Sequence, residues 1–144
     1  MKKSNEKTGM IIAVLEAVVS LFMILAVKII APVCPGMLEL VSGKQVHMKC
    51  YYAGVVFVFF AVLLLISAAL CFVTKQQLTC GIMTISLAVF VFLTFHDSIG
   101  VGICANPDMA CQMTAPFVKV SATIELILGA VSVFLAIQKG AEEK

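Results

Sequence analysis

Four long apolar stretches, separated by short polar segments, dominate the chain. They cover residues 10–33, 53–73, 78–95 and 116–138. A helix needs about 20 apolar residues to cross the ~30 Å hydrocarbon core of a bilayer, and each stretch is close to that length or exceeds it. Membrane β-barrel strands would instead alternate apolar and polar residues, and these stretches do not. The pattern therefore predicts an all-α fold, an integral membrane four-helix bundle formed by one domain over residues 1–144.

The composition supports this class and excludes two others. Hydrophobic residues make up 62% of the 144 residues and charged residues 12%, about half the charged share of an ordinary soluble domain. Such a chain is too apolar to be disordered, and it lacks the polar surface of a water-soluble globule. The net charge of +2 is too small to indicate a nucleic-acid partner. The lipid bilayer is therefore the first partner that the sequence predicts.

The lysines indicate how the predicted helices are oriented. Four spans place both termini on one side of the membrane, together with the short turn at residues 74–79. Six of the ten lysines would lie on that side: Lys2, Lys3, Lys7, Lys75, Lys139 and Lys144. Positively charged segments tend to remain in the cytoplasm, so we expect cytoplasmic termini and two short outer loops, at residues 34–50 and 96–115. The first apolar stretch exceeds the ~7–15 apolar residues of a signal peptide, so we expect it to be retained.

The cysteines divide between the two sides of the membrane. Four of the six fall in the outer loops: Cys34, Cys50, Cys104 and Cys111. An even number of cysteines on the oxidising side favours two disulfides, and four cysteines allow three pairings. The simplest pairing joins the two cysteines within each loop. Cys71 and Cys80 fall near the inner ends of their helices, where we expect them to be buried free thiols.

Two sharper interpretations of the outer cysteines remain open. Membrane enzymes that exchange disulfides with a quinone use two cysteine pairs, although this chain lacks the Cys-x-x-Cys motif that often lowers a thiol pKa. Cysteine, methionine and histidine also bind soft metals such as copper or zinc. Weak candidate ligands for such a site are His47, Met48, Cys50, Met109 and Cys111.

Charged residues interrupt two of the predicted spans. Glu125 lies near the middle of the fourth span, where a charged carboxylate costs about 2.5 kcal/mol or more. Ser121 and Gly129 lie one turn before and after it, so this face should point into the bundle or toward a partner protein. Glu125 could be a neutral, hydrogen-bonded acid or pair with Lys28 of the first span. Glu16 lies on a second face of small residues, in the inner part of the first span.

The two outer loops resemble those of a known family. The similarity is carried by Pro32-Val33-Cys34, by Met48-Lys49-Cys50, and above all by the segment from Gly102 to Cys111 with its Gly-x-Cys and Met-x-Cys elements. Small bacterial four-span proteins of the domain of unknown function family 4418 share these elements. The resemblance covers almost the whole chain and implies a bacterial plasma (inner) membrane. It also implies proximity to export-type ABC permeases, but no established activity.

The chain carries no motif of a familiar enzyme class. It has no phosphate-binding glycine-rich loop, no serine nucleophile elbow and no His-Glu-x-x-His, and its loops are too short for such enzymes. We therefore predict neither a catalytic residue nor a cofactor. We expect a non-enzymatic accessory subunit or modulator of a larger membrane complex, such as an ABC-type permease, that binds another membrane protein or a second copy of itself. The alternatives are a quinone-linked membrane thiol–disulfide oxidoreductase and a soft-metal-binding protein.

Overall fold

The computed structural model describes residues 2–34, 36–96, 98–102 and 108–142, and over these residues the chain forms a bundle of four long helices. In chain order they are α1 (Lys2–Leu25), α2 (Lys49–Thr74), α3 (Gln77–Thr94) and α4 (Ala110–Glu142). A π-helical turn, η1 (Ala26–Ile30), extends α1. All four helices are long and apolar enough to span a membrane. The predicted all-α fold of a multi-pass membrane protein is therefore confirmed.

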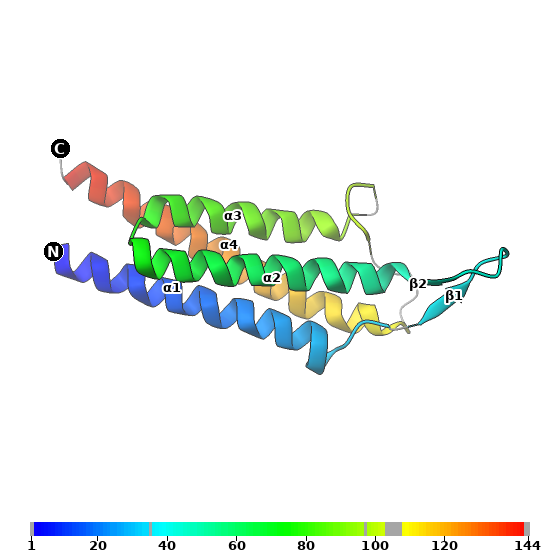
Figure 1. Ribbon diagram of the computed structural model, residues 1–144. Coiled ribbons are helices and arrows are strands. Elements are labelled where there is room, and N and C mark those ends of the chain that lie inside the picture. The colour runs from blue at the N-terminus through cyan, green and yellow to red at the C-terminus, as the bar shows by residue number, and fades with distance from the viewer. Residues whose placement is uncertain (1, 35, 97, 103–107, 143–144) are drawn as a thin grey trace.

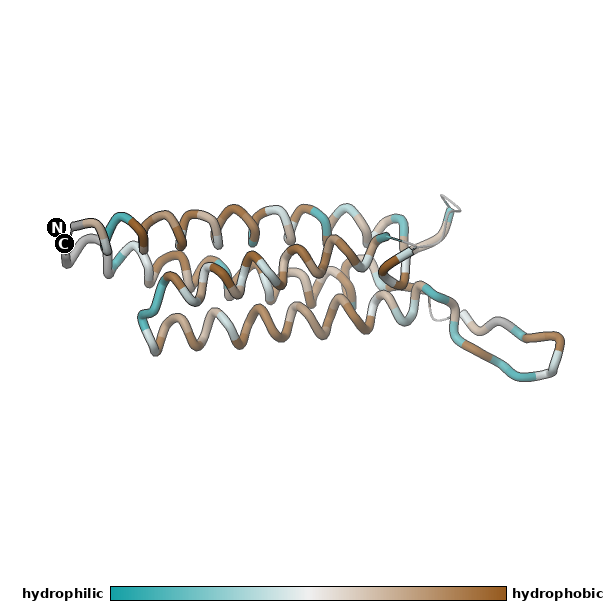
Figure 2. Tube along the Cα trace, turned by 90° about the horizontal axis from the view of Figure 1, so that it is seen from above, coloured by the Kyte–Doolittle hydropathy of each residue, from teal (hydrophilic) through white to brown (hydrophobic). Residues whose placement is uncertain are grey.

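The helices run alternately up and down, and each lies beside its neighbours in the chain. Lys75 and Gln76 alone join α2 to α3, and α4 closes the bundle by packing against both α3 and α1. Figure 1 shows the start of α1 and the end of α4 at the same end of the bundle. Figure 2 shows apolar residues along the full length of the helices. This arrangement fits four crossings of one bilayer.

A narrow apolar stripe forms the centre of the bundle. The core cluster consists of Met23, Val27, Ala53, Phe57, Ala61, Leu64, Val91, Val118 and Ala122. Phe57 is 2% exposed, and its ring centroid lies 4.8 Å from that of Phe95. Many other large apolar side chains face outward, among them Phe59, which is 60% exposed. The outward side chains give the bundle the apolar surface that hydrocarbon requires.

Two glycines allow α3 and α4 to approach closely. A Cβ atom on Gly81 would lie 2.8 Å from the carbonyl oxygen of Gly129, and a Cβ on Gly129 would lie 3.1 Å from the carbonyl oxygen of Gly81. Small residues permit such backbone contact between membrane helices. The face of α4 that carries Ser121, Glu125 and Gly129 is buried in the bundle, which is one of the two orientations that the sequence predicts for it.

The loop between α1 and α2 contains a β-hairpin that the apolar pattern does not predict. Strands β1 (Met37–Glu39) and β2 (Gln45–His47) pair antiparallel, with Met37 opposite His47. Gly43 lies in the turn with a positive φ of 77°, a conformation that glycine adopts at little cost. The hairpin projects beyond the bundle at the end opposite to the termini (Figure 1). The Ser-Gly dipeptide at residues 42–43 is a turn signal that could have revealed it.

The fourth helix begins earlier than the apolar pattern indicates. The predicted span starts at Pro116, but α4 begins at Ala110 and contains Pro116. Proline lacks the amide proton of an ordinary helical residue, yet membrane helices tolerate it where nearby groups satisfy the freed carbonyl. The early start matters for the site, because it places Cys111 in the first turn of α4.

Candidate functional site

The hairpin end of the bundle brings two cysteine sulfurs together. Cys50 lies in the first turn of α2 and Cys111 in the first turn of α4, and their Sγ atoms are 3.3 Å apart. Both residues are buried. Cys50 is disulfide-bonded, whereas Cys111 is a free thiol. A free thiol therefore lies against a sulfur that already belongs to a disulfide, which is the arrangement from which thiol–disulfide exchange starts.

The cysteines of the two predicted outer loops do not follow the simplest pairing, in which each loop has its own disulfide. Cys34 is a free, partly buried thiol, so it is not joined to Cys50. Cys111 is also free, so it is not joined to Cys104, which itself lies outside the described residues. Proximity along the chain favoured pairs within each loop. In the folded bundle, however, the first turns of α2 and α4 meet, and this places Cys50 beside Cys111 instead.

The candidate soft-metal ligands have different surroundings in the fold. The His47 ring stacks on Tyr51, with the ring centroids 4.2 Å apart. Met48 packs against Gly36, and Met109 is partly buried just before α4. Within the part of the chain that the structure describes, no three His, Cys, Asp or Glu side chains lie close enough together to hold a metal ion. The metal-binding alternative therefore stays a prediction.

A polar cluster lies inside the bundle between α1, α3 and α4. Glu125 on α4 is 0% exposed and Glu16 on α1 is 2% exposed. The Oγ of Ser20, one turn after Glu16, lies 3.0 Å from Oε1 of Glu125, and the buried hydroxyl of Thr84 on α3 has no hydrogen-bond partner among the residues that the structure describes. Lys28 is exposed, so the predicted alternative of a Lys28–Glu125 pair is not formed.

The Ser20 hydroxyl lies between two acceptors, the carbonyl oxygen of Glu16 and the carboxyl of Glu125. Ser20 Oγ lies 2.8 Å from the carbonyl oxygen of Glu16 as well as 3.0 Å from Glu125 Oε1. A serine hydroxyl has one proton to donate. The hydroxyl can therefore donate to only one of these two oxygens at a time, and Oε1 of Glu125 is one of them.

The faces around Glu16 and Glu125 are used within the bundle. Each carboxyl has one buried oxygen without a hydrogen-bond partner, Oε1 of Glu16 and Oε2 of Glu125. Both side chains point between the helices of this chain and not toward its surface. The small-residue faces around them therefore pack inside this bundle, which is the first of the two orientations that the sequence predicts.

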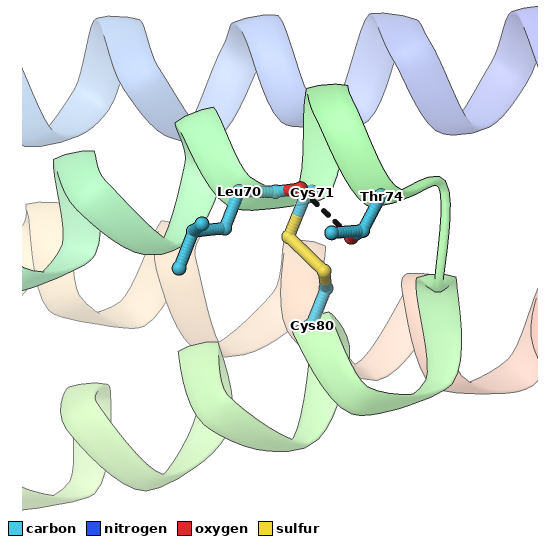
Figure 3. The surroundings of a disulfide bond; sticks show 4 residues. All are labelled: Leu70, Cys71, Thr74 and Cys80. Atoms are coloured by element: carbon cyan, nitrogen blue, oxygen red, sulfur yellow. Dashed lines mark hydrogen bonds between the residues drawn. A yellow bond between two sulfur atoms is a disulfide. The ribbon is translucent and has the colours of Figure 1, made fainter.

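The end of the bundle that holds the termini contains a cavity of about 230 Å³. All four helices contribute to its lining, which includes Glu16 of α1, Cys71 of α2, Cys80 of α3 and Ser132 of α4. Cys71 and Cys80 form a disulfide, with Cα atoms 5.7 Å apart, and Figure 3 shows it bridging α2 and α3. The prediction that both are free thiols is wrong. The two-residue turn between α2 and α3 makes the last turn of one helix face the first turn of the other, which the apolar pattern alone does not reveal.

Together these features define a four-span integral membrane protein with a sulfur site at each end of its bundle. The family model described as Domain of unknown function (DUF4418) matches residues 16–135, and the chain belongs to this family. The resemblance seen in the loops is thus confirmed. The matched region includes all six cysteines and both buried acids. No curated protein and no solved structure matches the chain.

The sequence places Ser20 on the small face around Glu16, because the two residues are four positions apart on one helix, but it does not show that Ser20 contacts Glu125. It does not single out Thr84 and Ser132, which are also buried, and Ser132 lines the cavity. Each lies in an apolar span where a lone hydroxyl residue is unremarkable.

Proposed function

We propose that this chain is a membrane thiol–disulfide oxidoreductase whose exchange step joins Cys111 to Cys50. The supporting observation is the 3.3 Å separation between the Sγ of the free Cys111 and the Sγ of the disulfide-bonded Cys50. The family match and the four spans fit such a protein but do not distinguish it from other membrane proteins.

The exchange conserves both atoms and electrons. The Cys111 thiolate attacks Cys50 Sγ, and a Cys50–Cys111 bond forms as the bond from Cys50 to its former partner breaks. That partner leaves as a thiolate and takes up the proton that Cys111 released. The number of disulfides does not change, so this step requires neither an oxidant nor a quinone.

The location of the pair agrees with this chemistry. The lysine distribution favours the hairpin end as the outer side, where disulfides persist. Cys50 is 0% and Cys111 2% exposed, so exchange between them is internal to the protein. An external thiol would first have to react with a more accessible cysteine, and Cys34, which is partly exposed, is such a residue.

Replacing Cys111 should abolish the exchange. In wild-type protein given a trace of dithiothreitol, then acid-trapped and digested without reduction, mass spectrometry should find a fraction of Cys50 linked to Cys111. In Cys111→Ser, Cys50 should keep a single partner, and oxidation of a reduced dithiol peptide by the purified protein should slow by about tenfold.

Cys34→Ser provides the matched control, because it removes the other free thiol among the described residues. This variant should retain the Cys50–Cys111 linkage. Finding only one invariant partner of Cys50 in wild-type protein, whatever the thiol concentration, would refute the exchange.

The hairpin supports a second candidate, an accessory subunit of a larger membrane complex such as an ABC-type permease. Its apolar side chains lie beyond the bundle: Met37 is 56%, Leu40 48% and Val41 110% exposed. Apolar groups clustered outside the bilayer are unfavourable in water and often mark a protein contact. A partner membrane protein that packs on the tip would cover them.

Polar substitution of the hairpin tip tests this role. Leu40→Ser combined with Val41→Ser should remove a partner that co-purifies with the wild-type chain in mild detergent, because it removes the apolar contact. Lys44→Ser, in the same hairpin, should retain the partner. If the doubly substituted chain keeps every partner of the wild type, the hairpin is not the docking element.

A further inference from the structure

We propose that the cavity at the termini end is a second redox site, in which Cys71 and Cys80 cycle between disulfide and dithiol and Glu16 handles the protons. The chemical class of the reaction partner is a dithiol. This inference does not rest on the exchange proposed for Cys50 and Cys111, since it concerns different cysteines at the other end of the bundle.

The pair is placed where a partner can reach it. The cavity of about 230 Å³ is lined by both cysteines, and Figure 3 shows their sulfurs meeting between α2 and α3. Cys71 is partly exposed, whereas Cys80 is 9% exposed. An incoming thiolate therefore meets the Cys71 sulfur first, and Cys80 becomes the leaving group.

The expected orientation makes a permanent disulfide at this end unfavourable. With cytoplasmic termini, as the lysines favour, the cavity opens toward the reducing compartment. Disulfides there are usually transient and serve catalysis or redox sensing. The Cα–Cα distance of 5.7 Å lies within the usual range for a disulfide, so the helix backbones hold the two cysteines close enough for the bond to form.

The cavity contains the charged groups that this chemistry needs. Its ionisable side chains, apart from the cysteines, are Glu16 of α1, Lys75 of the α2–α3 turn and Lys139 of α4. Glu125 lies behind them, joined to α1 through Ser20. Cationic side chains stabilise a nearby thiolate, which suits the two lysines. Glu16 is 2% exposed with Oε1 lacking a hydrogen-bond partner, so this oxygen is free to accept or deliver a proton.

The reaction balances with the dithiol alone. One thiolate of the dithiol attacks Cys71 Sγ, the Cys71–Cys80 bond breaks, and the Cys80 thiolate takes a proton from Glu16. The second thiol of the reductant then attacks the mixed disulfide, which releases the oxidised reductant and the Cys71 thiolate. The protein gains two electrons and two protons, and the dithiol loses the same. The two protons of the dithiol return to Glu16 and to Cys71.

Redox titration of the full-length protein in lipid or detergent tests the cycle. Mixtures of reduced and oxidised dithiothreitol serve as the probe, followed by acid trapping, alkylation and residue-resolved mass spectrometry. Cys71 and Cys80 should become reduced together and reoxidise fully when the buffer is reversed. The proposal is overturned if the pair stays bonded in excess dithiothreitol while the protein is folded, or if both remain thiols in oxidised dithiothreitol.

The rate at which the Cys71–Cys80 disulfide is reduced, measured against pH, tests the role of Glu16. Glu16→Gln should slow reduction of the pair about tenfold near neutral pH and change the shape of the pH profile, because an amide cannot transfer the proton. Glu39→Gln is the control, since Glu39 lies in the hairpin at the opposite end of the bundle and does not line the cavity, and it should retain the wild-type rate and profile. A wild-type profile in Glu16→Gln, or an equal change in both variants, would remove Glu16 from the site. Neither result would affect the test of the exchange at Cys50, because that exchange is measured by mass spectrometry on different peptides.

Discussion

Phe57→Ala should lower the free energy of unfolding by about 3 kcal/mol or more, the range observed when a buried phenylalanine is truncated. Phe57 is 2% exposed in the centre of the bundle and packs against Phe95. Its removal would leave a space that the surrounding helices can fill only partly. Lipid is as apolar as the core, so burying the ring gains little hydrophobic free energy inside a membrane. The lost packing contacts therefore account for most of the cost.

Phe59→Ala is the control, because Phe59 lies on the same helix and is 60% exposed. Its ring faces the region that lipid would occupy, so the same truncation should change stability by about 0.5 kcal/mol or less. Unfolding of both variants in mixed micelles, followed by circular dichroism against increasing SDS, measures the difference. Equal effects at the two positions would contradict the assignment of core and lipid faces.

Gly81→Ala should destabilise the bundle by about 1–3 kcal/mol, although alanine normally favours a helix over glycine by about 1 kcal/mol. The added methyl group would lie 2.7 Å from Val133 Cγ2 and 2.8 Å from the carbonyl oxygen of Gly129. The valine can yield, but the carbonyl belongs to the backbone of α4. The two helices would have to move apart, and their other contacts would weaken.

Gly140→Ala separates packing from helix propensity. A Cβ at Gly140 would meet nothing within 4 Å, so this change should leave stability unchanged or raise it. The same SDS titration compares the two variants. If Gly81→Ala proves as stable as Gly140→Ala, α3 and α4 do not cross at these glycines.

The number of spans could be predicted from the sequence because lipid imposes a strong constraint. Every backbone polar group within the bilayer must be satisfied inside the protein, so a long apolar stretch such as residues 53–73 has little choice but a helix. The hairpin at β1 and β2 lies outside this constraint. Its exposed strands have no clear alternation of apolar and polar residues, and only the Ser-Gly turn signals it.

The sites could be predicted only in part, because they depend on which helix ends meet. The sequence identifies Glu16 and Glu125 as unusual from their depth alone. It does not show that Ser20 approaches Glu125, since the contact joins residues 105 positions apart. The same limitation applies to Cys50 and Cys111, which are 61 positions apart. Cys71 and Cys80 were within reach of prediction, because so short a turn between two helices brings their adjoining ends together.

The placement of the two sulfur sites on opposite sides of the membrane is tested most directly by labelling two engineered cysteines. Val41→Cys at the hairpin tip and Gln76→Cys in the α2–α3 turn would each be made in a chain whose native cysteines are serine. A membrane-impermeant maleimide should label Val41→Cys in intact cells, and Gln76→Cys only after the membrane is opened. Labelling of both positions in intact cells, or of Gln76→Cys alone, would contradict the orientation from which the roles of the two sites are inferred.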